Sequence, residues 1–279
     1  MTAELRAAFA RHVALLGEAA DPRIEAAFAA TPRERFAGPG PWSIVLPGSG
    51  YVLSADVDPA RLYHDNLIAL DALAGINIGQ PSLHARCFAA LAVQPGESLV
   101  HVGAGSGYYT ALLARLTGPE GRVDAYEIRP DLAARAAENL ADLPWVRVHA
   151  GSGAVDRLQA ADVVYVSAGL AEPYPAWLDA LRPGGRLLFP LQSAERWGAM
   201  LLVRRPSNGT AWPARFVCAA GFIPCQAVAD GDAGRGLAAA FADGGWPLVR
   251  SLRRGGTPDA TCWFGGRGWW LSTAAADES

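Results

Sequence analysis

Three alternating glycines are the residues of this sequence whose spacing most directly predicts ligand binding. Residues 99–102 are a short apolar run, Gly103, Gly105 and Gly107 follow it, and a helical pattern begins directly after them. Glycines let the backbone adopt positive φ and let a ligand approach without a Cβ in the way, and the next helix offers unpaired N–H groups. The stretch therefore predicts a strand, a ligand-binding loop and a helix.

One acid strengthens this prediction. A second apolar run, residues 121–127, ends in Glu127, about 20 residues after the last of the three glycines. At that distance a carboxylate can accept hydrogen bonds from ribose hydroxyls, which indicates a cofactor that carries a nucleoside. The loop is G-x-G-x-G, whereas the dinucleotide fingerprint is G-x-G-x-x-G, and this spacing favours S-adenosylmethionine over NAD. For the glycines alone, a tight turn without a ligand is the alternative.

The motif over residues 102–108, with residues 121–123 and Glu127, resembles that of class I S-adenosylmethionine methyltransferases, and specifically the protein-L-isoaspartate O-methyltransferases. The resemblance covers roughly residues 22–205. It implies that S-adenosyl-L-methionine is the cofactor. Three further segments support the narrower match: Gly79-Gln80-Pro81, Val166-Ser167-Ala168 with Pro173, and residues 181–188. The positions that match the family's cofactor site are Gly103, Ala104, Gly105, Ser106, Gly107, Glu127, Ile128, Gly151 and Ser152.

Three positions depart from the family pattern. Gly79 stands where the family has a serine that contacts both cofactor and substrate. His101 lies in the middle of a strand where these methyltransferases usually have an acid. Ser152 stands where an acid usually accepts a hydrogen bond from the adenine amino group. These departures leave the acceptor and the strength of cofactor binding open.

Polar residues gather where the sequence predicts that a helix begins at Pro81. Asn77, Gln80, Ser82 and His84 fall close together there. Free N–H groups and the macrodipole at a helix N-terminus favour an anion such as a carboxylate, although ordinary N-capping is the alternative. Candidate catalytic residues are therefore Asn77, Gln80 and His84, and a structural histidine is the alternative for the last of them.

The alternation of strands and helices predicts an α/β fold with a doubly wound, mostly parallel, Rossmann-like sheet. We expect an N-terminal helical and loop segment over residues 1–75, a cofactor-binding core over 76–205 and a C-terminal β-rich extension over 206–279. In the first segment, helices are expected at 2–19 and 23–30, and an irregular stretch from Gly38 to about Pro59. The strands of the core are expected at 99–102, 121–127, 145–150, 161–168 and 186–191, with an antiparallel one at 199–204.

The extension is expected to hold a strand at 215–218, a helix near 237–241 and two strands before Trp269. Its aromatic side chains could cover the sheet or line a substrate pocket, and burial favours the first of these.

Composition limits the partners and the location of the chain. The net charge of −3 comes from interspersed charges without a basic stripe, so nucleic acid is not expected. No apolar run is long enough to cross a membrane and no signal peptide is apparent, which predicts a cytoplasmic protein. The four cysteines are scattered, so neither a metal site nor a disulfide framework is implied. The sequence does not indicate an oligomeric state.

Methyl transfer from a sulfonium needs an aligned nucleophile and the exclusion of water. A hydroxyl or amine usually has to lose a proton, whereas a carboxylate is already ionised at neutral pH. Because no convincing acid–base pair is present, the leading hypothesis is a carboxyl O-methyltransferase acting on a carboxylate-bearing peptide or a small acid. One alternative is O- or N-methylation of a small metabolite with His84 or His101 as the base. The other is a module that binds the cofactor without turnover.

Overall fold

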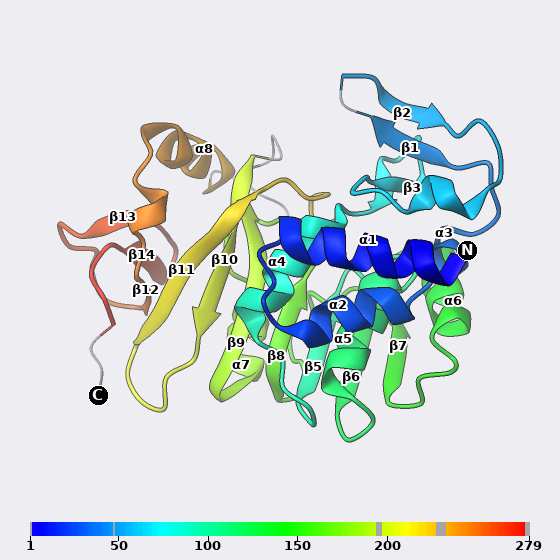
Figure 1. The fold of residues 1–279 in the computed structure, drawn as a ribbon. Helices are drawn as coiled ribbons and strands as arrows, with labels where there is room; N and C mark the ends of the chain where they lie inside the picture. Colours follow the sequence, from blue (N-terminus) through cyan, green and yellow to red (C-terminus); the bar gives the residue numbers. More distant parts are fainter. Residues whose placement is uncertain (1, 47, 194–196, 227–232, 277–279) are drawn as a thin grey trace. The chain divides into compact units, whose positions relative to one another are not determined.

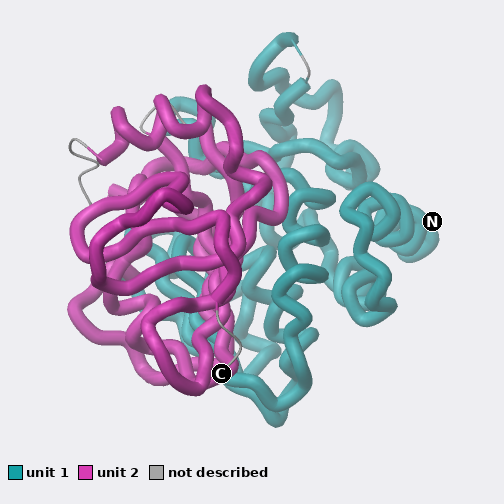
Figure 2. Tube along the Cα trace, turned by 90° about the vertical axis from the view of Figure 1, so that its left-hand side faces the viewer, with its two compact units in different colours: residues 1–152 teal, residues 153–279 magenta. Residues whose placement is uncertain are grey.

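The computed structural model describes residues 2–46, 48–193, 197–226 and 233–276. The chain divides into two units, residues 1–152 and 153–279, which are coloured separately in Figure 2. The three segments expected from the sequence have other boundaries, at 75/76 and 205/206, and that organisation stays a prediction.

The first unit contains three parallel strands in the order β5 (Ser98–Val102), β6 (Arg122–Glu127) and β7 (Val146–Ala150). Two helices connect them, α5 (Tyr108–Thr117) and α6 (Pro130–Asn139). The apolar side chains of β5 are buried, as is typical of a parallel strand covered on both faces. These five elements confirm the predicted Rossmann-like α/β fold of the core.

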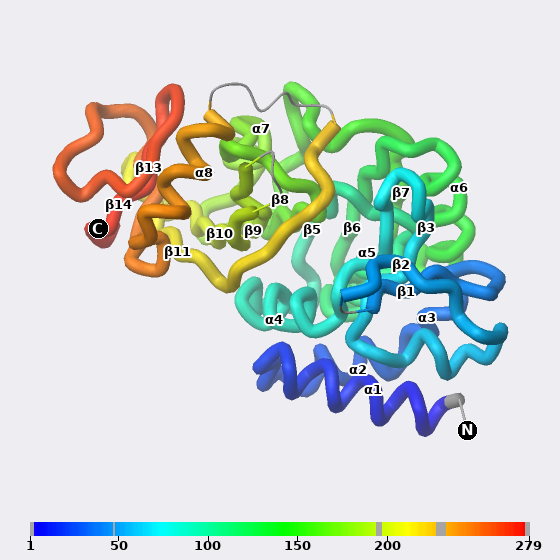
Figure 3. The backbone as a smooth tube through the Cα atoms, turned by 90° about the horizontal axis from the view of Figure 1, so that it is seen from above, coloured from blue at the N-terminus to red at the C-terminus, as the bar shows by residue number. Residues whose placement is uncertain are grey.

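Helices α1 (Thr2–Leu16) and α2 (Pro22–Ala30) lie side by side and pack against α4 (Pro81–Leu91) and α5 (Figures 1 and 3). Their buried side chains, among them Phe9, Val13 and Phe28, recur at the spacing of one helical face. A shorter helix, α3 (Arg33–Ala37), follows. Both predicted N-terminal helices are therefore confirmed.

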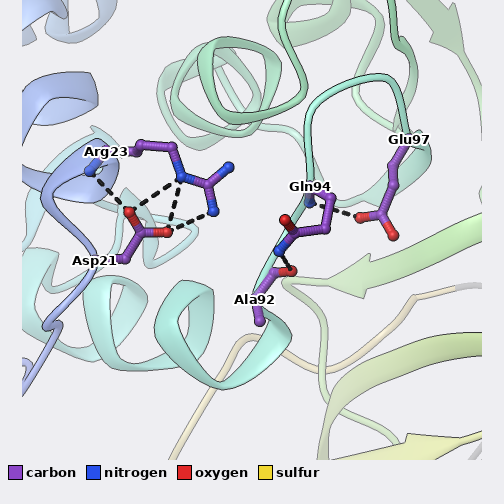
Figure 4. Close-up of polar contacts among 5 residues, drawn as sticks. All are labelled: Asp21, Arg23, Ala92, Gln94 and Glu97. Carbon is purple, nitrogen blue, oxygen red and sulfur yellow. Dashed lines mark hydrogen bonds and ion pairs between the residues drawn. The ribbon is translucent and has the colours of Figure 1, made fainter.

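Local hydrogen bonds fix where these helices begin and end (Figure 4). Asp21 caps α2, because its side chain accepts a hydrogen bond from the backbone N–H of Arg23 at 2.9 Å. The same carboxylate forms an ion pair with the guanidinium of Arg23 at 2.6 Å. After α4, the backbone N–H of Gln94 donates to Glu97 Oε2 at 2.8 Å, and Gln94 Nε2 donates to the carbonyl of Ala92 at 2.7 Å. These bonds shape the turn that leads into β5.

The stretch from Gly38 to Pro59, predicted to be irregular, contains two strands, so that prediction is wrong. Here β1 (Ser43–Leu46) and β2 (Gly50–Leu53) form an antiparallel hairpin. Together with β3 (Ile68–Asp71) and β4 (Ile76–Ile78) they make a sheet in the order β2-β1-β3-β4. Each strand has three or four residues, too few for an alternating pattern to stand out among glycines and prolines. Between β2 and β3 lies a 3₁₀ turn, η1 (Pro59–Leu62).

The described residues of the second unit form a mixed sheet. Strands β8 (Ala161–Val166) and β9 (Leu181–Gln192) are parallel, and β10 (Gly198–Arg204) and β11 (Ala211–Ala220) continue the sheet antiparallel. The fifth predicted strand begins earlier than expected, because residues 181–185 belong to β9 across a bulge. The remaining elements are α7 (Pro175–Ala180), α8 (Ala233–Asp243), η2 (Trp246–Leu248), β12 (Ser251–Arg254), β13 (Cys262–Gly266) and β14 (Trp269–Ser272).

Aromatic rings of the C-terminal extension contact one another. The ring of Phe216 lies edge-on to Phe241, Trp246 and Trp263, with centroid distances of 5.7, 5.5 and 5.4 Å. Edge-to-face contacts at these distances are favourable in a packed core. The arrangement supports the interpretation that these side chains cover the sheet.

The cap of α2 leads to a first prediction. Asp21→Ala should lower the free energy of unfolding by about 1 kcal/mol, because the N–H of Arg23 loses its acceptor. Asp21→Asn should retain most of that stability, since an amide oxygen also caps a helix and the ion pair is partly exposed. Urea denaturation of both variants measures the difference, and equal losses would show that the ion pair, not the cap, carries the effect.

Candidate cofactor and acceptor site

Residues 103–107, here called the glycine elbow, form a tight turn between β5 and α5. Gly103, Gly105 and Gly107 have φ values of +81°, +57° and +94°, a region that favours glycine. The backbone N–H groups of Gly103 and Ala104 both donate to the carbonyl of Tyr126, at 2.9 and 3.0 Å. The elbow is thereby tied to the end of β6.

Neighbouring side chains crowd two of the glycines of the elbow. A Cβ on Gly107 would lie 2.9 Å from Leu140 Cδ1, just beyond α6. A Cβ on Gly105 would lie 3.3 Å from Leu70 Cδ1 on β3. The sequence predicted glycines for ligand approach, and the structure adds close packing as a second reason for them.

Glu127 points at the elbow. Its side chain is 6% exposed, Oε2 accepts the N–H of Gly105 at 2.7 Å, and Oε1 accepts the N–H of Arg129 at 3.0 Å. The carbonyl of Glu127 accepts the N–H of Gly151 at 2.8 Å, which brings the residues after β7 to the same place. The elbow, the acid and Gly151 thus meet at the carboxyl ends of three parallel strands, where ligands bind in open α/β sheets.

Ser106 has a buried hydroxyl that the protein does not satisfy. Its side chain is 1% exposed, and among the described residues Oγ has no hydrogen-bond partner, although its carbonyl accepts from Asn139 Nδ2 at 2.9 Å. Leaving a buried hydroxyl unpaired costs about 1–3 kcal/mol, and a ligand that bonded Ser106 Oγ would remove that cost. Ile128, next to Glu127, is instead 41% exposed, an apolar surface at the same edge.

The N-terminus of α4 binds a carboxylate from the chain itself. Asp65 Oδ1 accepts the backbone N–H of Ser82 at 2.7 Å, and Oδ2 accepts Ser82 Oγ at 2.6 Å and Gln80 Nε2 at 2.8 Å. The sequence predicted an anion at this position and two of the residues that bind it, but missed Asp65. In the structure Gln80 at the N-cap makes no capping bond of its own, and Asp65, 17 residues before Ser82, supplies the cap.

Arg33 positions the segment that carries Asp65. Its guanidinium is fully buried and donates to the backbone carbonyls of Leu62, His64 and Asn66, at 2.9, 2.8 and 3.2 Å. The charge also lies over the ring of Tyr108, 5.5 Å from its centroid. A buried arginine that bonds three carbonyls of one loop fixes the path of that loop.

The other predicted acceptor residues lie in different surroundings. Asn77 Nδ2 donates to Tyr51 Oη at 3.0 Å and to the carbonyl of Gly75 at 3.1 Å, so Asn77 links strands of the small sheet. His84 is 1% exposed and stacks on Tyr109, with centroids 3.4 Å apart and planes 7° from parallel. The structure brings Gln80 and Ser82 together around Asp65, and the catalytic roles of Asn77, Gln80 and His84 stay predictions.

Both buried histidines of this unit are held neutral. Burial lowers the pKa of His84 well below its ordinary value, and the charges of His101 and Arg33 lower it further. Burial also lowers the pKa of His101 to about 3, and its Nδ1 lies 2.8 Å from Thr110 Oγ1. Neither imidazole is therefore a strong base at neutral pH.

An α/β sheet whose first strand leads into a glycine elbow faced by the acid of the second strand defines the class I methyltransferases. A profile of the family described as protein-L-isoaspartate(D-aspartate) O-methyltransferase matches residues 55–227. A protein-L-isoaspartate O-methyltransferase of Anaeromyxobacter dehalogenans (strain 2CP-C) is 38% identical over 181 residues, 58% of this chain and 85% of that protein. The chain belongs to the protein-L-isoaspartate(D-aspartate) O-methyltransferase family, which confirms the predicted resemblance.

Further comparisons agree. A protein-L-isoaspartate O-methyltransferase 1 of Anaeromyxobacter sp. (strain Fw109-5) is 34% identical over 223 residues, 76% of this chain and 93% of that protein. A solved structure of a putative protein-L-isoaspartate O-methyltransferase from Plasmodium falciparum, in complex with S-adenosyl-L-homocysteine, has a TM-score of 0.61 at 18% identity. It covers 79% of this chain and 98% of the other, and at that identity it shows the shared fold alone.

The described part of the chain lacks two kinds of feature. No helix there combines the length and apolar character that crossing a membrane requires. No cluster of His, Cys, Asp and Glu side chains there could hold a metal ion.

The contact between Glu127 and the elbow leads to a second prediction. Glu127→Gln should weaken S-adenosylhomocysteine binding about tenfold or more, because an amide NH₂ would face a backbone N–H and a charged acceptor is lost. Calorimetric titration measures the affinity. The matched control, Glu138→Gln on the exposed face of α6, should bind as the wild type does, and equal affinities for all three proteins would contradict the assignment of Glu127.

Gly79 leads to a third prediction. A Cβ on Gly79 would lie 2.6 Å from His84 Nε2, so Gly79→Ser should lower the free energy of unfolding by about 1–3 kcal/mol. His84→Ala removes the ring that the new side chain would meet, and the double variant should lose less stability than the sum of the two single losses. Urea denaturation of the wild type, the two single variants and the double variant measures all four stabilities. If the two single losses add up to the loss of the double variant, the steric contact between position 79 and His84 is ruled out.

Proposed function

We propose that this chain is a carboxyl O-methyltransferase that transfers the methyl group of S-adenosylmethionine to the free carboxylate of an isoaspartyl residue in a peptide or protein. The observation that carries the proposal is Glu127, whose carboxylate lies at the glycine elbow beside the buried hydroxyl of Ser106. Membership of the protein-L-isoaspartate(D-aspartate) O-methyltransferase family supports the same activity.

The residues around the elbow fit this cofactor. Glu127 would accept hydrogen bonds from the ribose hydroxyls, and Ser106 Oγ would gain the partner that it lacks. The exposed side chain of Ile128 would cover one face of the adenine, with Gly151 and Ser152 at its edge. Gly103, Ala104, Gly105 and Gly107 would leave the backbone of the elbow accessible to the methionine part. When bound, the cofactor supplies an electrophilic methyl group on a sulfonium.

A carboxylate acceptor suits the side chains of the first unit. Such a group has a pKa of about 4 and is ionised at neutral pH, so no base has to remove a proton. His84 and His101 are buried and their pKa values are lowered, which disfavours methylation of a hydroxyl or amine with either as the base. The task of the protein is then to hold the acceptor in line with the methyl group and to exclude water.

The acceptor carboxylate needs a place other than the N–H of Ser82, since Asp65 already accepts that hydrogen bond. Gln80 is exposed and adjoins Asp65, and Asn77 is partly exposed on the small sheet. We assign Gln80 and Asn77 as candidate contacts of the acceptor on this basis. His84, stacked and buried, shapes the loop from within.

The activity is tested by transfer of a tritiated methyl group to an isoaspartyl peptide, to the matched aspartyl peptide and to a panel of small carboxylic acids. The expected product is a base-labile methyl ester on the isoaspartyl peptide. Esters on small acids alone would move the acceptor class to metabolites. Binding of S-adenosylhomocysteine without any ester would identify a module that binds the cofactor without turnover.

The low pKa values of the buried histidines lead to a fourth prediction. Below a carboxyl pKa of about 4 the acceptor would be protonated, and above it no group that the reaction needs should titrate until well beyond neutrality. The value of kcat/KM for the isoaspartyl peptide should therefore be constant between about pH 6 and pH 8. A rise in kcat/KM centred near pH 6.5, the ordinary pKa of histidine, would instead indicate that a histidine acts as the base.

The proposal includes the expected setting of the enzyme. The net charge of −3 with interspersed signs supports independence from nucleic acid, and we retain this and the predicted cytoplasmic location as proposals. Cell fractionation and an electrophoretic shift assay with nucleic acid test them.

A further inference from the structure

The geometry points to Tyr109 as a positioning residue of the acceptor site, a role that rests on the function proposed above. Tyr109 is the second residue of α5, the helix that begins directly after the glycine elbow. Its hydroxyl donates a hydrogen bond to the carbonyl of Gly79 at 2.6 Å. One side chain thus joins the start of the elbow helix to the loop that leads into α4.

The ring of His84 lies between the ring of Tyr109 and the backbone of Gly79. The imidazole of His84 stacks on the phenol ring at 3.4 Å, and its Nε2 lies 2.6 Å from the point where a Cβ of Gly79 would be. Both rings are buried, so neither can move aside without losing its packing. A side chain at position 79 would therefore have to displace the His84 ring, and in the structure the backbone carbonyl of Gly79 is bound by Tyr109.

This arrangement bears on the serine that the family has at position 79. Here position 79 has no side chain, and its backbone carbonyl accepts a hydrogen bond from Tyr109, the second residue of the helix that begins directly after Gly107. The loop over residues 79–82 is otherwise held by Asp65, which binds Gln80 and Ser82. Tyr109 is consequently the contact that ties this loop to the element that binds the methyl donor. It sets the distance between acceptor and cofactor, on which in-line transfer depends.

The neighbouring tyrosine provides a matched control. Tyr108 is also buried in α5, but among the described residues its hydroxyl has no hydrogen-bond partner. Tyr108→Phe and Tyr109→Phe each remove one buried hydroxyl from adjacent positions of one helix. Only the second removes a hydrogen bond to the acceptor loop.

The experiment compares the two variants with the wild type in three measurements: steady-state methylation of an isoaspartyl peptide, calorimetric binding of S-adenosylhomocysteine, and amide hydrogen exchange. For Tyr109→Phe we expect kcat/KM to fall about tenfold or more, because a small displacement of a reacting group is costly. We expect its affinity for S-adenosylhomocysteine to stay within about twofold of the wild type, and exchange at residues 78–80 to accelerate. Tyr108→Phe should leave all three measurements near those of the wild type.

The outcomes separate this inference from the proposed function. Equal kcat/KM values for the two variants on an active wild-type background would overturn the role of Tyr109 and leave the proposed function intact. A wild type that methylates no acceptor would overturn the proposed function. In that case, faster exchange at residues 78–80 in Tyr109→Phe alone would still support the tie to the loop, and unchanged exchange would overturn it.

Discussion

The hydrogen bond from the N–H of Gly105 to the carboxylate of Glu127 is the interaction on which the site depends. It joins the turn after β5 to the end of β6 and holds the Glu127 side chain, a residue that is 6% exposed, at the carboxyl ends of the strands. A buried carboxylate is tolerated because each of its oxygens accepts a backbone N–H. In the proposed function the same acid binds the ribose, so these bonds would serve both the local stability of the elbow and the binding of a nucleoside.

The acceptor side is organised by a second buried charge. Arg33 binds three carbonyls of the segment that carries Asp65, and Asp65 then binds the first turn of α4. These bonds offset part of the cost of burying the charge, because carbonyl dipoles and the ring of Tyr108 lie around the guanidinium. The loop at Gly79 is thus fixed from the side of Asp65 and from the side of Tyr109.

Much of the core could be predicted, because β5, α5, β6, α6 and β7 follow from apolar runs, prolines at helix starts and the glycine spacing. The β1–β2 hairpin could not, since four-residue strands carry little periodic signal. The elbow and Glu127 were accessible because a local motif encodes them. The contacts of Asp65 and Arg33 and the Tyr109–Gly79 bond join residues 15 to 33 positions apart, and no local pattern reports such contacts. His84 was singled out by residue type, whereas its burial and stacking are tertiary properties.

The central claim, that the elbow and Glu127 bind the adenosyl cofactor, is tested most directly by titrating ¹⁵N-labelled protein with S-adenosylhomocysteine and following the backbone amides. The account predicts that the largest chemical-shift changes fall on Gly103, Gly105, Ser106 and Ile128, with smaller changes at Gly151. Saturable binding that leaves these amides unperturbed, or no binding at all, would contradict it.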